Sequence, residues 1–342
     1  MTTTTPGIAV QNPRRVVGRW LKSTPAYIVA ALVVLIIVFA VLAPSGRFLA
    51  AGNLQAIGRN SAELILLAVG LAFVLGAGHI DLSVGANLVL SSVAAASVIV
   101  HLSGTASDTG TYPHAGPAIA VGALVAVAVG AAMGLLNGVL VTKLRVNSFV
   151  ITLGTMGIAT GAAQVLTNGA NVAGIPPEVQ TGIGLHTVLG LPLPLLAVVI
   201  VSIVAGVALA QTRLGRHALA IGSSSPGAAR AGVNVHRTTI KVFVLAGLMS
   251  GAAGFIDITQ FGTTAISGHD TTMLQALSAV IIGGTSLFGG RASVTGAVVA
   301  TFIPTVLLSG FVMVGVSSFY QNIGIGAVLI IAVWLDQLRG RH

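Results

Sequence analysis

The 342-residue sequence lacks cysteine altogether and has few charged residues, at 7% of the chain. The absence of cysteine excludes a disulfide framework and any thiolate metal site. A soluble domain carries roughly 25% charged residues, whereas 55% of this chain is apolar and its mean hydropathy is +0.99. A water-soluble globule is therefore excluded, and the composition indicates a polytopic membrane protein.

Signatures of catalysis are also missing. No Walker A sequence, HExxH, GxSxG or cysteine cluster occurs in the chain. We therefore expect no ATPase or hydrolase activity, no catalytic residue, no metal site and no cofactor. What the chain does have is glycine, with 44 residues, which favours close packing of helices in lipid because small side chains let backbones approach.

About ten apolar runs approach the length of roughly 20 residues that a helix needs to cross the hydrocarbon core. Because an open sheet cannot satisfy its backbone in lipid, every span is expected to be a helix. The predicted fold is an all-α polytopic membrane protein with interrupted helices, in which a cytoplasmic tail over 1–25 precedes a transmembrane domain over 26–338. The expected spans are 26–43, 61–78, 84–102, 117–141, 148–166, 187–210, 240–259, 273–289, 293–315 and 319–336.

The distribution of basic residues predicts the orientation, since cytoplasmic loops are rich in Lys and Arg. With the N-terminus inside, all of the 16 Lys and Arg residues except Arg47 and Arg59 fall on the cytoplasmic side. Both termini are then cytoplasmic. The net charge of +9 is spread over these connections, so it indicates topology and not a nucleic-acid partner. The longest inner loop, about 211–239, is long enough to suggest a function of its own.

The string FVLGAGHIDLSVGANLVL at 73–90 places glycines, a histidine and an aspartate between two apolar runs. Ionisable groups are costly inside a membrane, so this segment needs partners. One interpretation is a helix end and a tight turn capped by Asp81. The other is a broken helix whose His79, Asp81 and Ser83 face the substrate. A second interruption, at 281–290, leaves the same two interpretations open.

Polar side chains within the apolar runs are further candidates for a substrate pathway. Asn137 and Thr152 lie in otherwise apolar spans, where most such groups form interhelical hydrogen bonds. Asp257 lies deep in the seventh run and must face the bundle or an aqueous path, unless the run ends early and leaves it in water. The predicted pathway residues are His79, Asp81, Ser83, Asn137, Thr152 and Asp257.

Ordered strings along the chain carry a family resemblance. The strings are IDLSVG at 80–85, GLLNGVLV at 134–141, FVITLGTMGIATG at 149–161, GVNV at 232–235, AVIIGGTSLFGG at 279–290 and LIIAVWLD at 329–336. Over about 60–336 the chain resembles the permease subunits of bacterial ABC sugar importers of the ribose, xylose and galactose class. The resemblance implies a homodimer in the bacterial inner membrane, in contact with lipid. It also implies import of a monosaccharide or similar polyol with an extracytoplasmic sugar-binding protein and a cytoplasmic ABC ATPase.

The sequence departs from that family at several points. His79 stands where the family usually has glycine, and Gln260 stands where an arginine is common. Met273, Leu274 and Gln275 replace the Glu-Leu-Asp of the family. The inner loop reads SSPGAAR in place of Asn-x-Glu-Ala-Ala-Arg. These changes leave the fold intact but bear on the substrate.

The inner loop is the expected contact with the ATPase, as the resemblance implies. Its sequence predicts a short helix that ends at Gly222 and a second turn after Pro226. Small residues there would permit close docking, whereas the alternative is a helix pair held at the membrane surface by its arginines. The predicted coupling residues are Pro226, Ala228, Ala229, Arg230 and Gly232.

The residues alone leave a second function open, an ion-coupled secondary carrier for a small polar solute. Asp81 or Asp257 would then be the ion site. The family resemblance and the long basic inner loop favour the importer.

Overall fold

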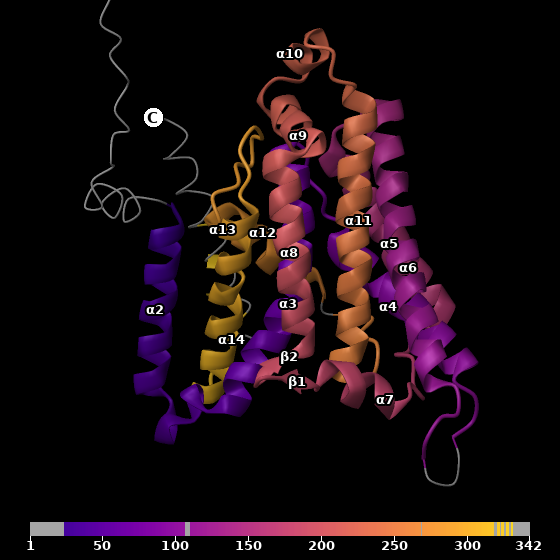
Figure 1. The fold of residues 1–342 in the computed structure, drawn as a ribbon, viewed down its shortest axis with the longest axis vertical. Coiled ribbons are helices and arrows are strands. Elements are labelled where there is room, and N and C mark those ends of the chain that lie inside the picture. The colour runs from indigo at the N-terminus through magenta and orange to yellow at the C-terminus, as the bar shows by residue number, and fades with distance from the viewer. Residues whose placement is uncertain are drawn as a thin grey trace, which may run out of the picture.

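The computed structural model describes residues 24–106, 110–267 and 269–317, with scattered residues from 320 to 330. Its long helices run side by side in one bundle (Figure 1). Seven of the described helices are long and apolar enough to cross a membrane, and a shorter apolar helix, Ala26–Leu42, precedes them. The prediction of a helical, multi-pass membrane protein is confirmed, while the count of ten spans and the cytoplasmic termini stay predictions.

Helices make up nearly all of the described secondary structure. In chain order they are α2 (Thr24–Leu42), the 3-10 helix η1 (Pro44–Leu49), α3 (Ala51–Gly76), α4 (Val84–Leu102), α5 (Ala115–Leu144), α6 (Ser148–Thr167), α7 (Pro177–Val179), the π-helical turn η2 (Gln180–Gly184), α8 (Leu193–Gln211), α9 (Arg213–Ser223), α10 (Ser225–Arg230), α11 (Val235–Phe261), α12 (His269–Ile282), α13 (Val294–Ala300) and α14 (Phe302–Val314). The described strands are β1 (Thr187–Val188) and β2 (Leu191–Pro192), an antiparallel pair with Thr187 opposite Pro192.

Several helices begin at residues other than those predicted, and α3 and α8 differ most. α3 begins at Ala51 instead of residue 61, because polar side chains that made this stretch look like a loop are accommodated within the fold. Asn53, for example, is buried and donates from Nδ2 to the Phe48 carbonyl at 2.7 Å. α8 begins at Leu193 instead of residue 187, because the β1–β2 hairpin takes up the residues before it.

The eighth predicted run is shorter than its hydropathy suggested. α12 ends at Ile282, whereas the apolar run continues to 289. Gly284 and Gly289 adopt φ of +93° and +85°, a conformation that glycine reaches without steric cost. The chain therefore turns back at this point instead of extending the helix.

The ninth predicted run, 293–315, is confirmed as an apolar helical stretch long enough to cross a membrane, Val294–Val314, which a turn at Thr301 divides into α13 and α14. Pro304 has no N–H to donate to the carbonyl four residues earlier and its ring crowds that carbonyl, which accounts for the division. The tenth run, 319–336, lies almost entirely outside the described residues.

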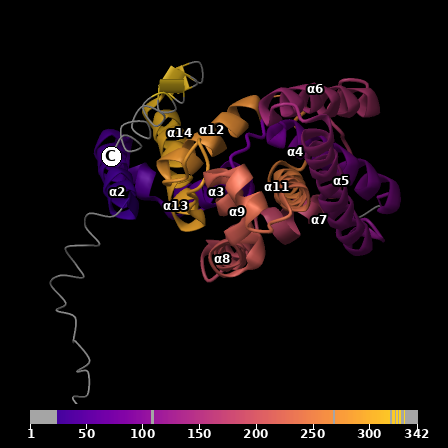
Figure 2. The ribbon, with the colours of Figure 1, turned by 90° about the horizontal axis from the view of Figure 1, so that it is seen from above.

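The helices differ in how much of their surface is buried. Figure 2 shows α3 and α11 near the middle, with α2, α13 and α14 on one side and α4, α5 and α6 on the other. In their most apolar stretches, α3 is 89% buried but α6 only 22% and α8 only 28%. Ile158 and Val165 of α6 are 60% and 79% exposed. Such apolar outward faces fit contact with lipid or with another hydrophobic partner.

Glycines allow α5 and α11 to pack closely. A Cβ at Gly130 of α5 would lie 2.3 Å from the Gly247 carbonyl oxygen of α11, and one at Gly247 would lie 2.2 Å from the Gly130 carbonyl oxygen. No side chain fits at either position. The expectation that glycine permits close helix contact is confirmed at this pair.

Several basic connections meet at one end of the bundle, which carries α9 and α10 and which we call the α9–α10 end (Figure 1). Arg145, after α5, lines the same cavity as Pro226 of α10. The turn before Arg291 is bonded to the end of α3, since Gly290 donates to the Gly76 carbonyl at 3.0 Å. This clustering agrees with the predicted charge bias.

Candidate functional site

The first interruption, residues 77–83 between α3 and α4, is held in a non-helical conformation by hydrogen bonds to side chains of α6. Ile80 N–H donates to Ser148 Oγ at 3.0 Å, and Leu82 N–H donates to Thr152 Oγ1 at 3.1 Å. Thr152 Oγ1 lies 3.3 Å from the Ile80 carbonyl oxygen. Breaking a helix frees backbone groups that must find partners within the protein, and α6 supplies them here.

Asp81 is the centre of a buried polar network within this interruption. Its Oδ1 accepts from the Ser83 N–H at 2.9 Å and from Ser83 Oγ at 2.6 Å. Asn137 Nδ2 of α5 donates to Ser83 Oγ at 2.7 Å, and Thr155 Oγ1 of α6 donates to Asn137 Oδ1 at 2.6 Å. The network therefore joins the interruption to α5 and α6.

Four of the predicted pathway residues thus come together, namely Asp81, Ser83, Asn137 and Thr152. All four are at most 3% exposed, and they bond to one another or to backbone. The arrangement favours the first of the two interpretations, an anchored turn, and their contact with substrate stays a prediction.

His79 lies apart from that network and lines a cavity of about 710 Å³ at the α9–α10 end, together with Pro226 and Ala229. Its ring is 5.7 Å from that of Phe243, and its Nε2 is 3.4 Å from Thr239 Oγ1. Burial lowers the pKa of His79, because desolvation disfavours the charged imidazolium.

The two interruptions and α9 touch through glycine. A Cβ at Gly222, near the end of α9, would lie 2.1 Å from the Gly76 carbonyl oxygen and 2.5 Å from Gly290 N. Gly76 ends α3, and Gly290 belongs to the turn between α12 and α13. We call these three residues the glycine junction. It puts the predicted coupling loop in direct backbone contact with both interruptions.

The predicted short helix pair of the inner loop is present as α9 and α10. Ser224 caps α10 by accepting from Gly227 N–H at 3.1 Å, and Gly232 with φ +82° ends the turn that follows. Among the predicted coupling residues, Ala228 is only 5% exposed. It packs inside the protein and is not available to a docking partner. The exposed members are Pro226, Ala229, Arg230 and Gly232.

Phe288 is a feature of this end that the sequence analysis missed. It lies in the α12–α13 turn, is 73% exposed and lines the same cavity as His79. Its position within an apolar run concealed it, because only the turn brings it to the surface.

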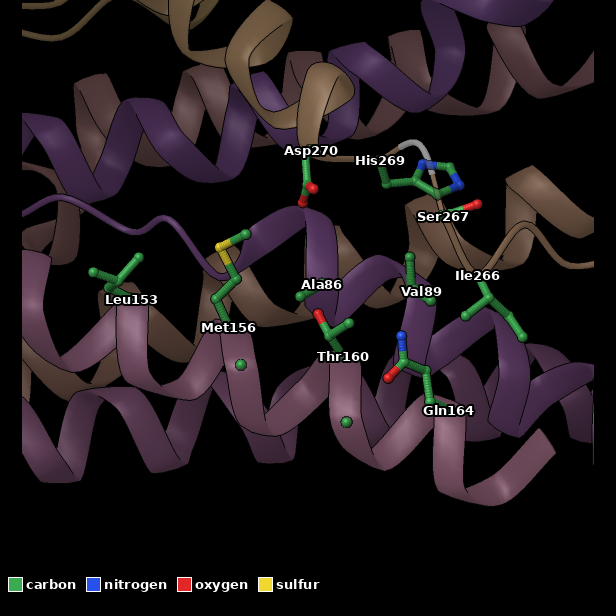
Figure 3. Close-up of a pocket in the computed structure, with 12 residues that line it drawn as sticks. Ala86, Val89, Leu153, Met156, Thr160, Gln164, Ile266, Ser267, His269 and Asp270 are labelled. Atoms are coloured by element: carbon green, nitrogen blue, oxygen red, sulfur yellow. The ribbon is translucent and has the colours of Figure 1, made fainter. Parts of the chain in front are cut away.

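A second cavity, of about 550 Å³, lies between α4, α6 and the start of α12. Figure 3 shows Met156, Thr160 and Gln164 of α6 on one wall and His269 and Asp270 on the other. The volume is within the range of roughly 300–1,000 Å³ found for small-molecule sites. Hydroxyl, amide and carboxylate groups on an otherwise apolar lining suit an uncharged polar ligand.

Asp257 belongs to a different cluster from the other predicted pathway residues. It is fully buried, and its Oδ1 is 3.7 Å from His269 Nε2. His269 Nδ1 is in turn 3.4 Å from Glu63 Oε1. Asp257 therefore faces the protein interior and not water at a helix end. The sequence analysis missed Glu63 and His269, because nothing in a linear pattern signals that they meet.

Comparison with known proteins gives a consistent result. The chain matches the family described as branched-chain amino acid transport system, permease component, over residues 53–333. It is 35% identical over 337 residues to the ribose import permease protein of Escherichia coli K12, covering 96% of this chain and 97% of that protein. It is 36% identical over 307 residues to the ribose import permease protein of Bacillus subtilis 168, covering 90% of each. It is 31% identical over 338 residues to the L-arabinose ABC transporter permease protein of Azospirillum brasilense, covering 99% of this chain and 95% of that protein. No solved structure matches the chain significantly.

Proposed function

The chain belongs to the permease-component family of the branched-chain amino acid transport system, and from this premise we propose that it translocates a monosaccharide through the bacterial inner membrane. The observation that carries the proposal is the similarity over almost the whole chain to ribose and L-arabinose permeases. A binding protein delivers the sugar, and a separate ABC ATPase supplies the energy.

The cavity of Figure 3 supports a sugar substrate. Thr160, Gln164 and Ser267 offer hydroxyl and amide groups, which can exchange hydrogen bonds with an uncharged sugar. A permease that takes its substrate from a binding protein needs only weak contacts, because tight binding would trap the sugar on its way.

The α9–α10 end is the proposed site of contact with the ATPase and therefore the cytoplasmic side. Ala229 and Arg230 are exposed there, beside the cavity of about 710 Å³ that Phe288 also lines. Because Gly222 of α9 touches both interruptions, a displacement of α9 and α10 is transmitted directly to the end of α3 and to the turn between α12 and α13. The glycine junction thus provides a route from the ATPase to the spans.

The proposal also includes a second copy of the chain and a topology of ten spans. The outward apolar faces of α6 and α8 contact lipid or the second copy. Ten spans with both termini inside would satisfy the charge bias.

Single cysteines give a direct test of this topology, since the chain has no cysteine. Positions 170–182 should react with an impermeant reagent outside intact cells, and positions 218–228 should not. Labelling of 218–228 from outside would refute this orientation.

The decisive test of function is reconstitution. Proteoliposomes that contain the permease with its ATPase should take up a labelled pentose or hexose only when ATP is inside and the cognate binding protein is outside. The ion-coupled carrier predicts the opposite, uptake by the permease alone in response to an ion gradient. Uptake under that second condition would disprove the proposal.

A further inference from the structure

Three ionisable side chains meet inside the half of the bundle opposite the α9–α10 end. They are Glu63 of α3, Asp257 of α11 and His269 at the start of α12. One nitrogen or oxygen atom from each lies within 4.8 Å of those of the other two. Glu63 is 7% exposed, His269 is 9% exposed and Asp257 is fully buried.

These groups lack the partners that buried polar atoms normally have. Among the residues that the structure describes, both Asp257 oxygens, both His269 ring nitrogens and Glu63 Oε1 have no hydrogen-bond partner. The closest approaches, 3.4 Å to Glu63 and 3.7 Å to Asp257, are longer than a hydrogen bond of about 2.7–3.2 Å. Nearly all buried polar groups are paired, because an unpaired one costs free energy. Two carboxylates so placed need a cation.

We infer that Glu63, Asp257 and His269 form a binding site for a divalent transition-metal ion of the Zn²⁺ type. Two ionised carboxylates and a neutral imidazole carry a charge of minus two, so a divalent ion makes the cluster neutral where uncompensated charge is costly. A nitrogen with two carboxylate oxygens is a donor set that Zn²⁺ accepts, whereas Ca²⁺ and Mg²⁺ prefer oxygen alone. This site was not expected from the sequence.

The three side chains must move closer together to hold an ion. Zn²⁺ binds these donors at about 2.0–2.2 Å in a tetrahedral arrangement, so the donor atoms of a filled site lie about 3.3–3.6 Å apart. The donor atoms now lie within 4.8 Å of one another, but His269 faces Glu63 with Nδ1 and Asp257 with Nε2. Binding therefore requires the side chains to turn until one ring nitrogen and both carboxylates point at the ion. Three protein ligands leave a fourth position for water.

Cavities reach the cluster from two directions. One of about 260 Å³ extends to Glu63 and is lined by Asn60, Gln260 and Gln275. The cavity of Figure 3 extends to His269. The first gives the ion an entry path, with amides that can bind a water on the metal.

A bound ion would join the start of α12 to α3 and α11. Ile266 and Ser267, just before α12, line the cavity of Figure 3 together with His269. The ion would therefore fix one wall of that cavity. The inference stands on the cluster alone and holds whether or not the cavity receives a sugar.

The test is zinc binding to the full-length permease, purified in detergent with a tag that contains no histidine. After treatment with EDTA and dialysis, zinc sulfate is titrated and the protein-bound zinc is measured by mass spectrometry. Wild type should retain about one zinc per chain, and its unfolding temperature should rise with zinc concentration. Asp257→Asn and His269→Gln should each weaken binding at least about 100-fold, because loss of an outer partner alone costs 10–100-fold.

Matched variants separate this site from other residues that bind zinc. Asp270→Asn, beside His269, and His114→Gln, in an outer loop, should bind zinc as wild type does. X-ray absorption should detect one nitrogen and oxygen ligands at about 2.0–2.2 Å. Absence of zinc from wild type, or unchanged binding by His269→Gln, would overturn the inference. So would an unfolding temperature that responds to pH but not to zinc, since a proton on His269 would then balance the carboxylates.

Discussion

The two halves of the bundle each contain a buried carboxylate, in opposite situations. At the α9–α10 end, Asp81 is 3% exposed and accepts two hydrogen bonds from Ser83. In the other half, Asp257 is fully buried, and neither of its oxygens has a hydrogen-bond partner among the described residues. Burial is nearly equal, so it does not explain the difference. The neighbouring groups explain the difference, because Asp81 meets N–H and O–H donors, whereas Asp257 meets a second carboxylate and an imidazole.

This contrast distinguishes a carboxylate that holds a backbone in place from one that requires a cation. Removal of the first carboxylate should lower the free energy of unfolding under all conditions. Removal of the second should lower it only when the cation is bound. The four predictions that follow run from the largest expected effect on stability to the smallest.

Asp81→Leu should have the largest effect. It leaves the N–H and Oγ–H of Ser83 without an acceptor, and each such buried group costs about 1–3 kcal/mol. We expect a loss of about 2–4 kcal/mol in the free energy of unfolding, seen as low abundance and early thermal aggregation in detergent. Asp81→Asn keeps an acceptor oxygen and should retain most of the stability. An Asp81→Leu protein as stable as wild type would show that the network does not anchor the interruption.

Gly222→Ala should have the second-largest effect on stability. Its Cβ would lie 2.1 Å from the Gly76 carbonyl oxygen, and overpacking of this kind costs about 1–3 kcal/mol. Because α9 would be displaced from both interruptions, sugar-stimulated ATP hydrolysis should also fall. Gly206→Ala in α8 is the matched control, since its Cβ would meet nothing closer than 3.8 Å. Equal behaviour of the two variants would remove the glycine junction from the coupling route.

Asp257→Asn should act in the opposite direction to Asp81→Leu when the protein is free of metal. It relieves the repulsion between two carboxylates that share one imidazole, and replacement of unfavourable buried charge often stabilises a protein. The expected gain is about 1 kcal/mol, measured by thermal unfolding in the presence of EDTA. A loss as large as that of Asp81→Leu would mean that Asp257 has a structural partner in the metal-free protein.

Ala229→Trp should leave stability almost unchanged, because the residue is exposed on α10. If the α9–α10 end docks on the ATPase, the bulky ring should prevent co-purification of the ATPase and abolish ATP-dependent uptake. Ala170→Trp is the control, an exposed alanine in the predicted outer loop, and should keep the ATPase bound. Normal co-purification with Ala229→Trp would place the coupling contact elsewhere, with Phe288 the next residue to test.

Composition and hydropathy were sufficient to predict a helical membrane protein, because crossing lipid leaves the backbone few alternatives. They also located most of the spans. Helix ends were less predictable, as the early start of α3 and the end of α12 at Ile282 show. At both places the outcome depended on contacts with distant residues, which a window of neighbouring residues does not contain.

The polar residues illustrate the same limit. Glycines and Asp81 in the string at 73–90 marked an interruption, since these residues are costly within a continuous helix in lipid. The sequence did not show that Asn137 would pair with Ser83, or that Ala228 would be buried beneath the predicted coupling surface. Those facts depend on the rotation of each helix about its axis, which packing decides.

The sequence by itself therefore determined the class of the protein, its family and the places where helices break, because these follow from local chemistry and from ordered strings. The tertiary structure alone decided which buried groups meet. Glu63, Asp257 and His269 lie as many as 206 positions apart on α3, α11 and α12. They form one cluster only because close packing of the bundle fixes the height and rotation of these three helices relative to one another.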